Sequence, residues 1–299
     1  MFEGSLTALI TPFRNGKLDE KAFRRLVEWQ IESGTTALVP VGTTGESPTV
    51  SHTEHRRMVE LCVETSGGRV PVIAGTGSNS TAEAVAFAQH AKKAGADAQL
   101  SVAPYYNKPT QEGLYSHFKA INDATDLPIL LYNIPGRSIV DISVETMARL
   151  AKLPNVVGVK DATLDLARPT LTRIACGPDF CQLSGEDATA LAQRAMGGHG
   201  CISVTSNIAP RLCADMHQAW SAGDVARAQE INELLMPLHM ALFCETNPAP
   251  VKYAASLLGL CSAEVRLPIC DIAEASKRTV EEAMIAAGLI EKGKIAKAG

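Results

Sequence analysis

Eight short apolar segments recur along this 299-residue chain, and each is followed by a stretch with helical periodicity. Strands that alternate with crossover helices form parallel sheets. Eight such units, with no domain-sized insertion and no dinucleotide-binding glycine pattern after the first, favour a closed barrel over an open sheet. We therefore predict an α/β fold, a (β/α)8 TIM barrel. The predicted strands cover residues 6–10, 37–41, 71–74, 98–102, 128–132, 156–160, 181–184 and 200–204.

The chain continues beyond the last predicted strand with helical periods only. These cover residues 207–223, 224–243, 248–258 and 272–287. We predict that residues 1–223 form the barrel with its last helix and that residues 224–299 form a C-terminal helical region packed on it. The final residues, 291–299, carry three lysines and are expected to be a solvated end.

The composition of the chain indicates which kinds of binding partner are not expected. The net charge is −4 and no lysine or arginine cluster occurs, so nucleic acid is not expected as a partner. The sequence shows neither a membrane-spanning segment nor a secretion signal, and a cytoplasmic protein is expected. Eight cysteines occur without a Cys-x-x-Cys pair or a histidine at metal-ligand spacing. We expect free, mostly buried thiols and no metal site.

Lys160 is the charged residue that closes the apolar run Val156-Val157-Gly158-Val159. Chemistry in a (β/α)8 barrel takes place at the C-terminal ends of the strands, which is where this lysine lies. Burial disfavours an ammonium ion and favours the free amine, the nucleophile that condenses with a carbonyl. A lysine at the end of a strand more often reaches water with its head group. Its setting nevertheless makes Lys160 a Schiff-base candidate.

Other polar residues follow predicted strands and would collect at the same rim. Each has an ordinary alternative role, as a turn, a packing tyrosine or a surface arginine. Adjacent threonines with free backbone N–H groups also suit a small carboxylate, and an arginine suits one through two parallel hydrogen bonds. The pair Glu186-Asp187 is expected to cap the helix that follows. The rim candidates are Thr43, Thr44, Ser47, Tyr105, Tyr106, Tyr132 and Arg137.

Four motifs together resemble the pyruvate-dependent class I aldolase superfamily and, within it, the dihydrodipicolinate synthase family. They are Gly42-Thr43-Thr44-Gly45-Glu46, Pro104-Tyr105-Tyr106-Asn107-Lys108-Pro109, Tyr132-Asn133-Ile134-Pro135-Gly136-Arg137 and Val157-Gly158-Val159-Lys160-Asp161. The resemblance covers essentially the whole chain. It implies a homotetramer built as a dimer of dimers, with no metal or organic cofactor. It also implies a lyase that condenses pyruvate with L-aspartate 4-semialdehyde in lysine and diaminopimelate synthesis.

The resemblance assigns a role to each rim residue. Lys160 would form an imine with pyruvate, and Tyr132 would transfer protons beside it. Thr43 and Tyr106 would complete a hydroxyl relay, with Tyr106 supplied by the neighbouring subunit. Thr44 and the Ile202 backbone would hold the pyruvate carboxylate, and Arg137 would orient the carboxylate of the semialdehyde.

The same resemblance implies a second site, at which free L-lysine acts as a feedback inhibitor at the dimer interface. Its members here would be Ser47, Pro48, His52, His55, Asn79, Glu83 and Tyr105. Proline at position 48 departs mildly from the family pattern, in which alanine is common. Glu83 would pair with an ammonium group, and Asn79 would bind the amino-acid head group.

Two alternatives remain open at this point. Other members of the superfamily, such as N-acetylneuraminate lyases and 2-keto-3-deoxy sugar acid aldolases, share the lysine and tyrosine and differ in the second substrate. The Thr43-Thr44 pair and Arg137 favour the semialdehyde. A catalytically silent sensor of a keto acid or amino acid is the other alternative, although none of the four catalytic candidates has been lost.

Overall fold

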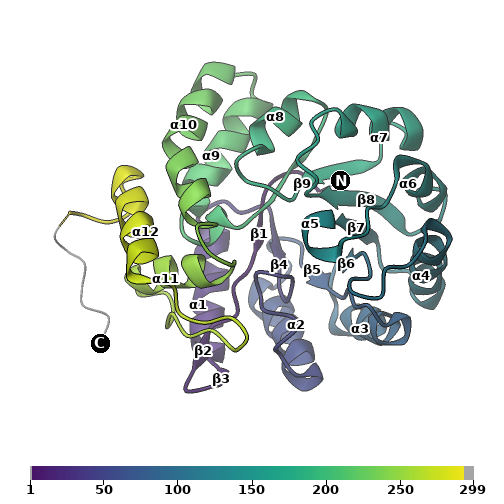
Figure 1. Ribbon diagram of the computed structural model, residues 1–299, viewed down its shortest axis with the longest axis horizontal. Coiled ribbons are helices and arrows are strands. Elements are labelled where there is room, and N and C mark those ends of the chain that lie inside the picture. The colour runs from purple at the N-terminus through teal and green to yellow at the C-terminus, as the bar shows by residue number, and fades with distance from the viewer. Residues whose placement is uncertain (1, 293–299) are drawn as a thin grey trace.

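A computed structural model, which describes residues 2–292, contains eight parallel strands surrounded by helices (Figure 1). Met1 and residues 293–299, including the end of the predicted tail, lie outside the described part. The barrel strands are β1 (Gly4–Ala8), β4 (Ala37–Val39), β5 (Ile73–Gly75), β6 (Ala98–Val102), β7 (Ile129–Asn133), β8 (Val156–Asp161), β9 (Cys181–Ser184) and β10 (Gly200–Ser203). Each predicted strand overlaps one of them.

The eight strands close on themselves. Their order is β4-β1-β10-β9-β8-β7-β6-β5, and all neighbours pair in parallel. A bridge between Leu38 and Val72 joins the two ends of this order, and Gly75 N donates to Pro40 O at 3.0 Å across the same seam. The (β/α)8 prediction is therefore confirmed.

Helices follow the strands and cover the outside of the barrel. They are α1 (Glu20–Glu32), α2 (His52–Ser66), α3 (Thr81–Ala94), α4 (Gln111–Ala124), α6 (Val144–Leu150), α7 (Arg168–Cys176), α8 (Ala190–Ala195) and α9 (Pro210–Ser221). Local signals set several ends: Ser51 and Glu54 form a capping box on α2, and Gly67 ends that helix in the left-handed region. The hairpin of β2 (Phe13–Arg14) and β3 (Lys17–Leu18), the short α5 (Pro135–Ser138) and the 3-10 turn η1 (Thr205–Asn207) were not predicted.

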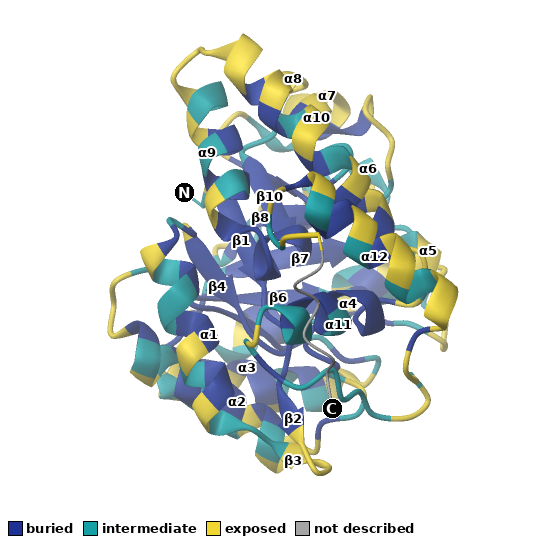
Figure 2. Cartoon of the chain, turned by 90° about the vertical axis from the view of Figure 1, so that its left-hand side faces the viewer, coloured by how far each residue is buried: buried dark blue, intermediate teal, exposed yellow. Residues whose placement is uncertain are grey.

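The buried residues lie mainly in the barrel strands and on the inner faces of the helices. The barrel strands are almost wholly dark blue in Figure 2, whereas exposed residues gather on the outer faces of the helices. In α1, Phe23, Leu26 and Val27 are buried at helical spacing and pack into the largest apolar cluster. The strands read as near-continuous apolar runs because both of their faces are covered.

The C-terminal helices are α10 (Val225–Ala241), α11 (Ala249–Leu257) and α12 (Glu274–Ala286), which confirms the predicted helical periods. Figure 1 shows α12 beside α11 on the flank of the barrel. Leu238 of α10 and Met284 of α12 belong to the same apolar cluster as Leu26 of α1. The division of the chain at residues 223 and 224 stays a prediction.

A buried ion pair also joins the C-terminal helices to the barrel. Lys252 Nζ of α11 lies 2.7 Å from Glu46 Oε1 in the loop after β4, and neither side chain is exposed. Arg266 N donates to the other oxygen of Glu46 at 3.0 Å. Lys252 Nζ also lies 4.2 Å from the centroid of the Phe13 ring. Burial lowers the pKa of Lys252, and Glu46 opposes that shift.

Removing one charge of this pair should cost far more stability than removing both. We expect Lys252→Met to lower the free energy of unfolding by about 3–5 kcal/mol, because it leaves Glu46 buried without its partner. The double variant Glu46→Gln/Lys252→Met should lose less stability than Lys252→Met alone, because no unpaired charge is then left buried. Urea unfolding at one protein concentration measures this. Arg227→Gln, which breaks an exposed pair with Glu230, is the control and should change stability by less than about 1 kcal/mol.

Candidate active site

Lys160 and Tyr132 are neighbours across two paired strands. Tyr132 is the penultimate residue of β7, Lys160 is the penultimate residue of β8, and the two are direct partners in the parallel register. Both are 5% exposed, and Lys160 Nζ lies 4.2 Å from the centroid of the Tyr132 ring. The fold thus places a nearly buried amine beside a phenol at the C-terminal end of the barrel, where chemistry is expected.

Gly185, which directly follows β9, leaves room for the Lys160 side chain. A Cβ atom added to Gly185 would lie 3.1 Å from Lys160 Cε and 2.8 Å from Ala162 Cβ. The Gly185 N–H donates to Asp161 O at 2.6 Å, which keeps this backbone against β8. The sequence analysis did not identify Gly185, because the requirement for glycine comes from a residue 25 positions away.

The residues that follow Tyr132 and Lys160 form a polar network. Alternate residues of a strand point to opposite faces, so Asn133 and Asp161 lie on the other face of the sheet from Tyr132 and Lys160. Asn133 Nδ2 donates to Asp141 Oδ1 at 2.7 Å and to Asp161 Oδ2 at 3.2 Å. Arg168 of α7, which is 9% exposed, has Nε 3.1 Å from Asp161 Oδ2 and donates to Asp141 Oδ2 at 2.9 Å. This network ties β7 to β8 directly behind the amine and the phenol.

A cavity of about 200 Å³ opens at the same rim. It brings together five of the predicted residues, Thr43, Ser47, Pro48, Tyr105 and Arg137. Arg137 lies in α5 and is exposed toward solvent. Lys160, Tyr132, Thr44 and Ile202 do not line this cavity and are buried.

Thr44 and Ile202 lie deeper. Thr44 is 3% exposed, and its Oγ1 accepts a hydrogen bond of 3.0 Å from Asn247 Nδ2. Ile202 lies on β10, paired with Leu6 of β1, and is 1% exposed. Asn247 precedes α11 and is a member of this site that the sequence analysis missed, since nothing local marks a contact across 203 positions.

Asp187 does not cap α8, and the capping expectation for Glu186-Asp187 was wrong. The cap residue of α8 is Thr189, which makes no side-chain capping bond. Asp187 Oδ2 instead accepts from the N–H groups of Val204 at 2.8 Å and Thr205 at 3.2 Å. It therefore holds the chain just after Ile202. Burial, and then the neighbouring Asp187 charge, raise the pKa of Glu186.

Tyr106 is not part of the pocket formed by its own chain. Its side chain is 90% exposed, and its φ of +71° lies in the left-handed region, which non-glycine residues rarely adopt. A large phenol held out in solvent is available to a second molecule.

Of the residues predicted for the second site, Ser47, Pro48 and Tyr105 line the cavity, and His52, His55 and Glu83 form a cluster with Ser78 and Phe87. His52 Nε2 lies 2.6 Å from Glu83 Oε1, and Ser78 Oγ donates to Glu83 Oε2 at 2.5 Å. His55 stacks on Phe87 with ring centroids 4.0 Å apart, and its Nε2 lies 2.8 Å from Gly75 O. Burial lowers the pKa of His55 to about 4, so this ring is neutral at neutral pH.

Tyr105 and Asn79 lie close to that cluster. Burial, and then the charge of Glu83, raise the pKa of Tyr105. Asn107 Nδ2 donates to Asn79 O at 2.8 Å and so connects the Tyr105-Tyr106 loop to the turn before α3. Glu83 is the acidic group of this cluster that would attract an ammonium.

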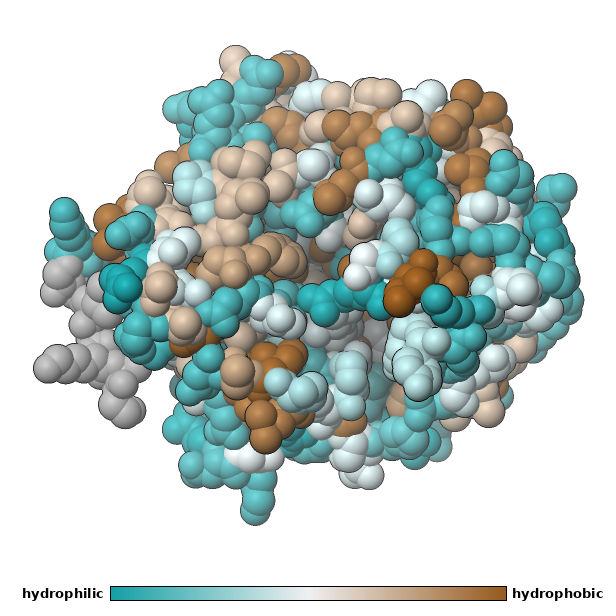
Figure 3. All heavy atoms as spheres, in the orientation of Figure 1, coloured by the Kyte–Doolittle hydropathy of each residue, from teal (hydrophilic) through white to brown (hydrophobic). Residues whose placement is uncertain are grey.

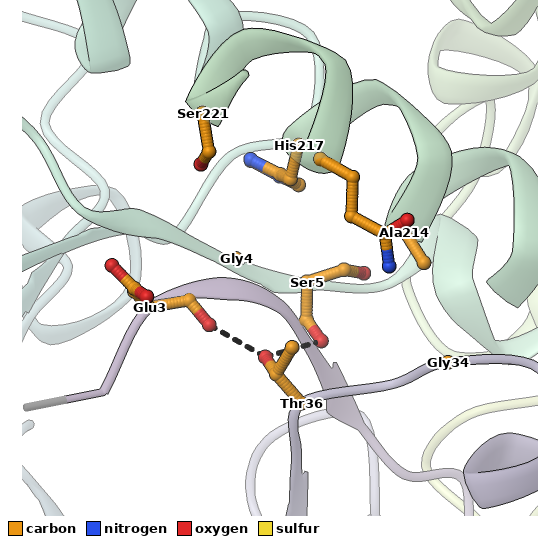
Figure 4. A pocket seen from close by; sticks show the side chains of 9 residues that line it. Glu3, Gly4, Ser5, Gly34, Thr36, Ala214, His217 and Ser221 are labelled. Atoms are coloured by element: carbon orange, nitrogen blue, oxygen red, sulfur yellow. Dashed lines mark hydrogen bonds between the residues drawn. The ribbon is translucent and has the colours of Figure 1, made fainter.

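A second cavity, of about 230 Å³, lies at the N-terminal ends of the strands. Figure 4 shows the residues that line it. It is formed by Gly4 and Ser5 at the start of β1, Thr36 before β4, and His217 and Ser221 of α9. Thr36 Oγ1 donates to Glu3 O at 2.6 Å and to Ser5 O at 2.9 Å. This cavity lies at the N-terminal ends of the strands, whereas the candidate catalytic groups lie at the C-terminal ends.

Within residues 2–292 no group of three or more His, Cys, Asp or Glu side chains that could hold a metal ion comes together. No helix in that part of the chain is long and apolar enough to cross a membrane. All eight cysteines are free, and five are buried, as expected.

Comparisons with known proteins identify the family to which the chain belongs. The sequence model of the Dihydrodipicolinate synthetase family matches residues 1–287. The chain belongs to the dihydrodipicolinate synthetase family.

Members of that family are similar to this chain over nearly its whole length. The 4-hydroxy-tetrahydrodipicolinate synthase of Rhodospirillum centenum is 67% identical over 290 residues, which cover 97% of this chain and 100% of that one. The chloride-inhibited dihydrodipicolinate synthase of Acinetobacter baumannii, solved in complex with pyruvate, is 45% identical with a TM-score of 0.95 and coverages of 97% and 100%. The Cyanidioschyzon merolae enzyme, solved with lysine bound, is 39% identical with a TM-score of 0.94 and coverages of 97% and 99%.

A side chain at position 185 should interfere with Lys160. We expect Gly185→Ala to lower the rate of imine formation with pyruvate by about tenfold or more, because the new methyl group contacts Lys160 Cε and Ala162 and displaces the amine. Borohydride trapping followed by mass spectrometry measures this. Gly136→Ala is the matched control, since a Cβ atom there meets nothing within 4 Å. Equal trapping rates for the two variants would contradict the role of Gly185.

Proposed function

We propose that this chain is a 4-hydroxy-tetrahydrodipicolinate synthase, a lyase that condenses pyruvate with L-aspartate 4-semialdehyde through a lysine Schiff base. The observation that carries the proposal is the nearly buried amine of Lys160, 4.2 Å from the Tyr132 ring at the catalytic end of the barrel. Relatives of this chain at 61–67% identity bear that enzyme name. The pathway is lysine and diaminopimelate biosynthesis.

The chemistry follows from an amine in this position. Lys160 Nζ attacks the ketone carbon of pyruvate, and loss of water leaves a protonated imine. The positive nitrogen withdraws electrons, so a methyl proton leaves and an enamine forms. The enamine carbon bonds to the aldehyde carbon of the semialdehyde, whose oxygen takes up a proton. The amino group of the semialdehyde then attacks the imine carbon and displaces Lys160, which closes the ring and restores the free amine.

Each rim residue has a role in these steps. Tyr132, beside Lys160, donates and accepts protons, and Thr43 with a partner's Tyr106 passes them to solvent. Thr44 and the Ile202 backbone hold the pyruvate carboxylate in the buried part of the site. Arg137, exposed at the mouth of the cavity, receives the carboxylate of the semialdehyde. These steps use no metal or organic cofactor.

The proposed assembly is a homotetramer of two dimers. The exposure of Tyr106 supports a dimer in which each phenol completes the site of the other chain. Exposed apolar residues on and near α7 support association of the dimers. Figure 3 shows that apolar side chains, in brown, reach the surface among polar ones. The exposed apolar residues on and near α7 are Leu164, Leu166, Leu171 and Ile174, with Ile174 at 77% exposure.

The proposed regulator is free L-lysine, bound between two copies of the cluster around Glu83. The Glu83 carboxylate, already oriented by His52 and Ser78, would accept from the lysine ammonium. His55, neutral above a pKa of about 4, serves there as a stacking and packing group on Phe87. Pro48 is exposed at the edge of the cavity shared with Ser47 and Tyr105.

Turnover tests the function directly. With pyruvate and L-aspartate 4-semialdehyde, coupled to a reductase that consumes NADPH, we expect rapid pyruvate-dependent turnover. Lys160→Ala should abolish both turnover and covalent trapping of pyruvate, since no amine remains to form the imine. Trapping without turnover on the wild-type protein would indicate an aldolase for another aldehyde, and sugar acids would be tested next. Binding of pyruvate without trapping or turnover would indicate a silent sensor.

Mixing two inactive variants tests whether Tyr106 acts across the dimer. We expect Tyr106→Phe alone to lower kcat by about tenfold or more, because the relay loses its hydroxyl. When Tyr106→Phe and Lys160→Ala chains are refolded together in equal amounts, the mixture should show about one quarter of the wild-type activity. Half of its dimers are then mixed, and each mixed dimer holds one complete site. If Tyr106 served its own chain, no mixed dimer would hold a complete site and no activity would return.

Inhibition tests the second site. L-lysine should inhibit the wild-type enzyme, and Glu83→Gln should raise the concentration needed by about 10- to 100-fold, because a charged hydrogen bond is lost. Glu112→Gln, an exposed glutamate on α4 paired with Arg149, is the control and should leave inhibition unchanged. An unchanged rate of the wild-type enzyme at saturating L-lysine would refute the proposal.

A further inference from the structure

One of the hydrogen bonds between the C-terminal region and the turn after β4 ends on the hydroxyl group of Thr44. Asn247 Nδ2 donates to Thr44 Oγ1 at 3.0 Å, and the two residues are 203 positions apart. Both side chains are nearly buried, with Thr44 3% and Asn247 4% exposed. The direction of the bond follows from the two groups, because an amide nitrogen can donate a hydrogen bond but cannot accept one.

The direction of this bond decides what the Thr44 hydroxyl can do. A hydroxyl group carries one hydrogen to donate and two lone pairs to accept with. Because Thr44 Oγ1 accepts from Asn247, its own hydrogen is not used in that contact. In the described part of the chain that hydrogen has no acceptor, since the bond with Asn247 is the one that the Thr44 side chain makes. It therefore remains free for an acceptor that enters the site.

Three further contacts join the C-terminal region to the same turn. Lys252 of α11, five residues after Asn247, pairs with Glu46 at 2.7 Å with both side chains fully buried. Arg266 donates from its backbone N to Glu46 at 3.0 Å and from its side chain to Thr49 O at 3.0 Å. Glu46 itself has a φ of +56°, so the turn adopts a backbone that needs such support.

We propose that Asn247 is a positioning residue that directs the hydroxyl hydrogen of Thr44 at the carboxylate of the keto acid. The inference rests on the proposed function, in which Thr44 holds the pyruvate carboxylate. An asparagine amide can donate to Oγ1, whereas an ionised aspartate at the same position can only accept. Aspartate would therefore turn the Thr44 hydrogen away from the substrate while keeping nearly the same shape.

A double-mutant cycle tests this. The concentration of pyruvate that half-saturates borohydride trapping of Lys160 is measured at about pH 8.5, where the new carboxyl group ionises. We expect Asn247→Asp to raise that concentration by about 10- to 100-fold. In a Thr44→Val background, which has no hydroxyl to redirect, Asn247→Asp should cause no further rise. Urea unfolding of each variant shows whether the fold is retained.

The outcomes separate the inference from simpler effects. If Asn247→Asp weakens pyruvate binding equally in both backgrounds, the cause is charge repulsion and the inference is overturned. If Asn247→Asp fails to fold, Asn247→Ala replaces it. That variant should raise the half-saturating concentration a few-fold when Thr44 is present and should cause no rise in the Thr44→Val background; equal effects again overturn the inference. A wild-type protein that traps no pyruvate overturns the proposed function as well, whereas normal wild-type trapping with unaffected variants overturns the inference alone.

Discussion

The parallel pairing of β7 and β8 is the constraint on which the rest of the site depends. Its register places Tyr132 opposite Lys160, one residue before the end of each strand. Because side chains alternate across a strand, the same register sends Asn133 and Asp161 to the other face, where Arg168 joins them. A slip of one residue would move one pair to the face of the other. The same strand register therefore positions both the catalytic candidates and the polar network behind them.

The remaining parts of the site are brought to this pair from distant segments. Gly185 leaves the space that Lys160 occupies, and Asp187 holds the backbone just after Ile202. Asn247 and Lys252 reach back from the C-terminal region onto Thr44 and Glu46. The C-terminal helices therefore do more than cover apolar surface. They complete a buried polar cluster whose members have few other possible partners.

Much of the fold was predictable because hydrophobic periodicity is a local property. Each of the eight predicted strands overlaps an observed one, and β6 and β9 have the predicted limits. The two-residue strands β2 and β3 were missed because so short a hairpin leaves no period to detect. The capping assignment of Asp187 was wrong because its partners are distant in the sequence. Its carboxylate accepts from the backbone N–H groups of Val204 and Thr205, just after β10, and not from the helix that follows it.

The sequence alone predicts the order of strands and helices, the motifs that mark the family, and the residue types available for imine chemistry and carboxylate binding. These are properties of neighbouring residues, and local patterns encode them. The tertiary structure shows that Tyr106 is exposed on its own chain, and it supplies the contacts that hold the site together. Lys160 lies beside Tyr132, Lys252 pairs with Glu46, and Asn247 meets Thr44. Those contacts join residues that are far apart along the chain. They arise from the closure of the barrel and the packing of the C-terminal helices, which no local pattern specifies.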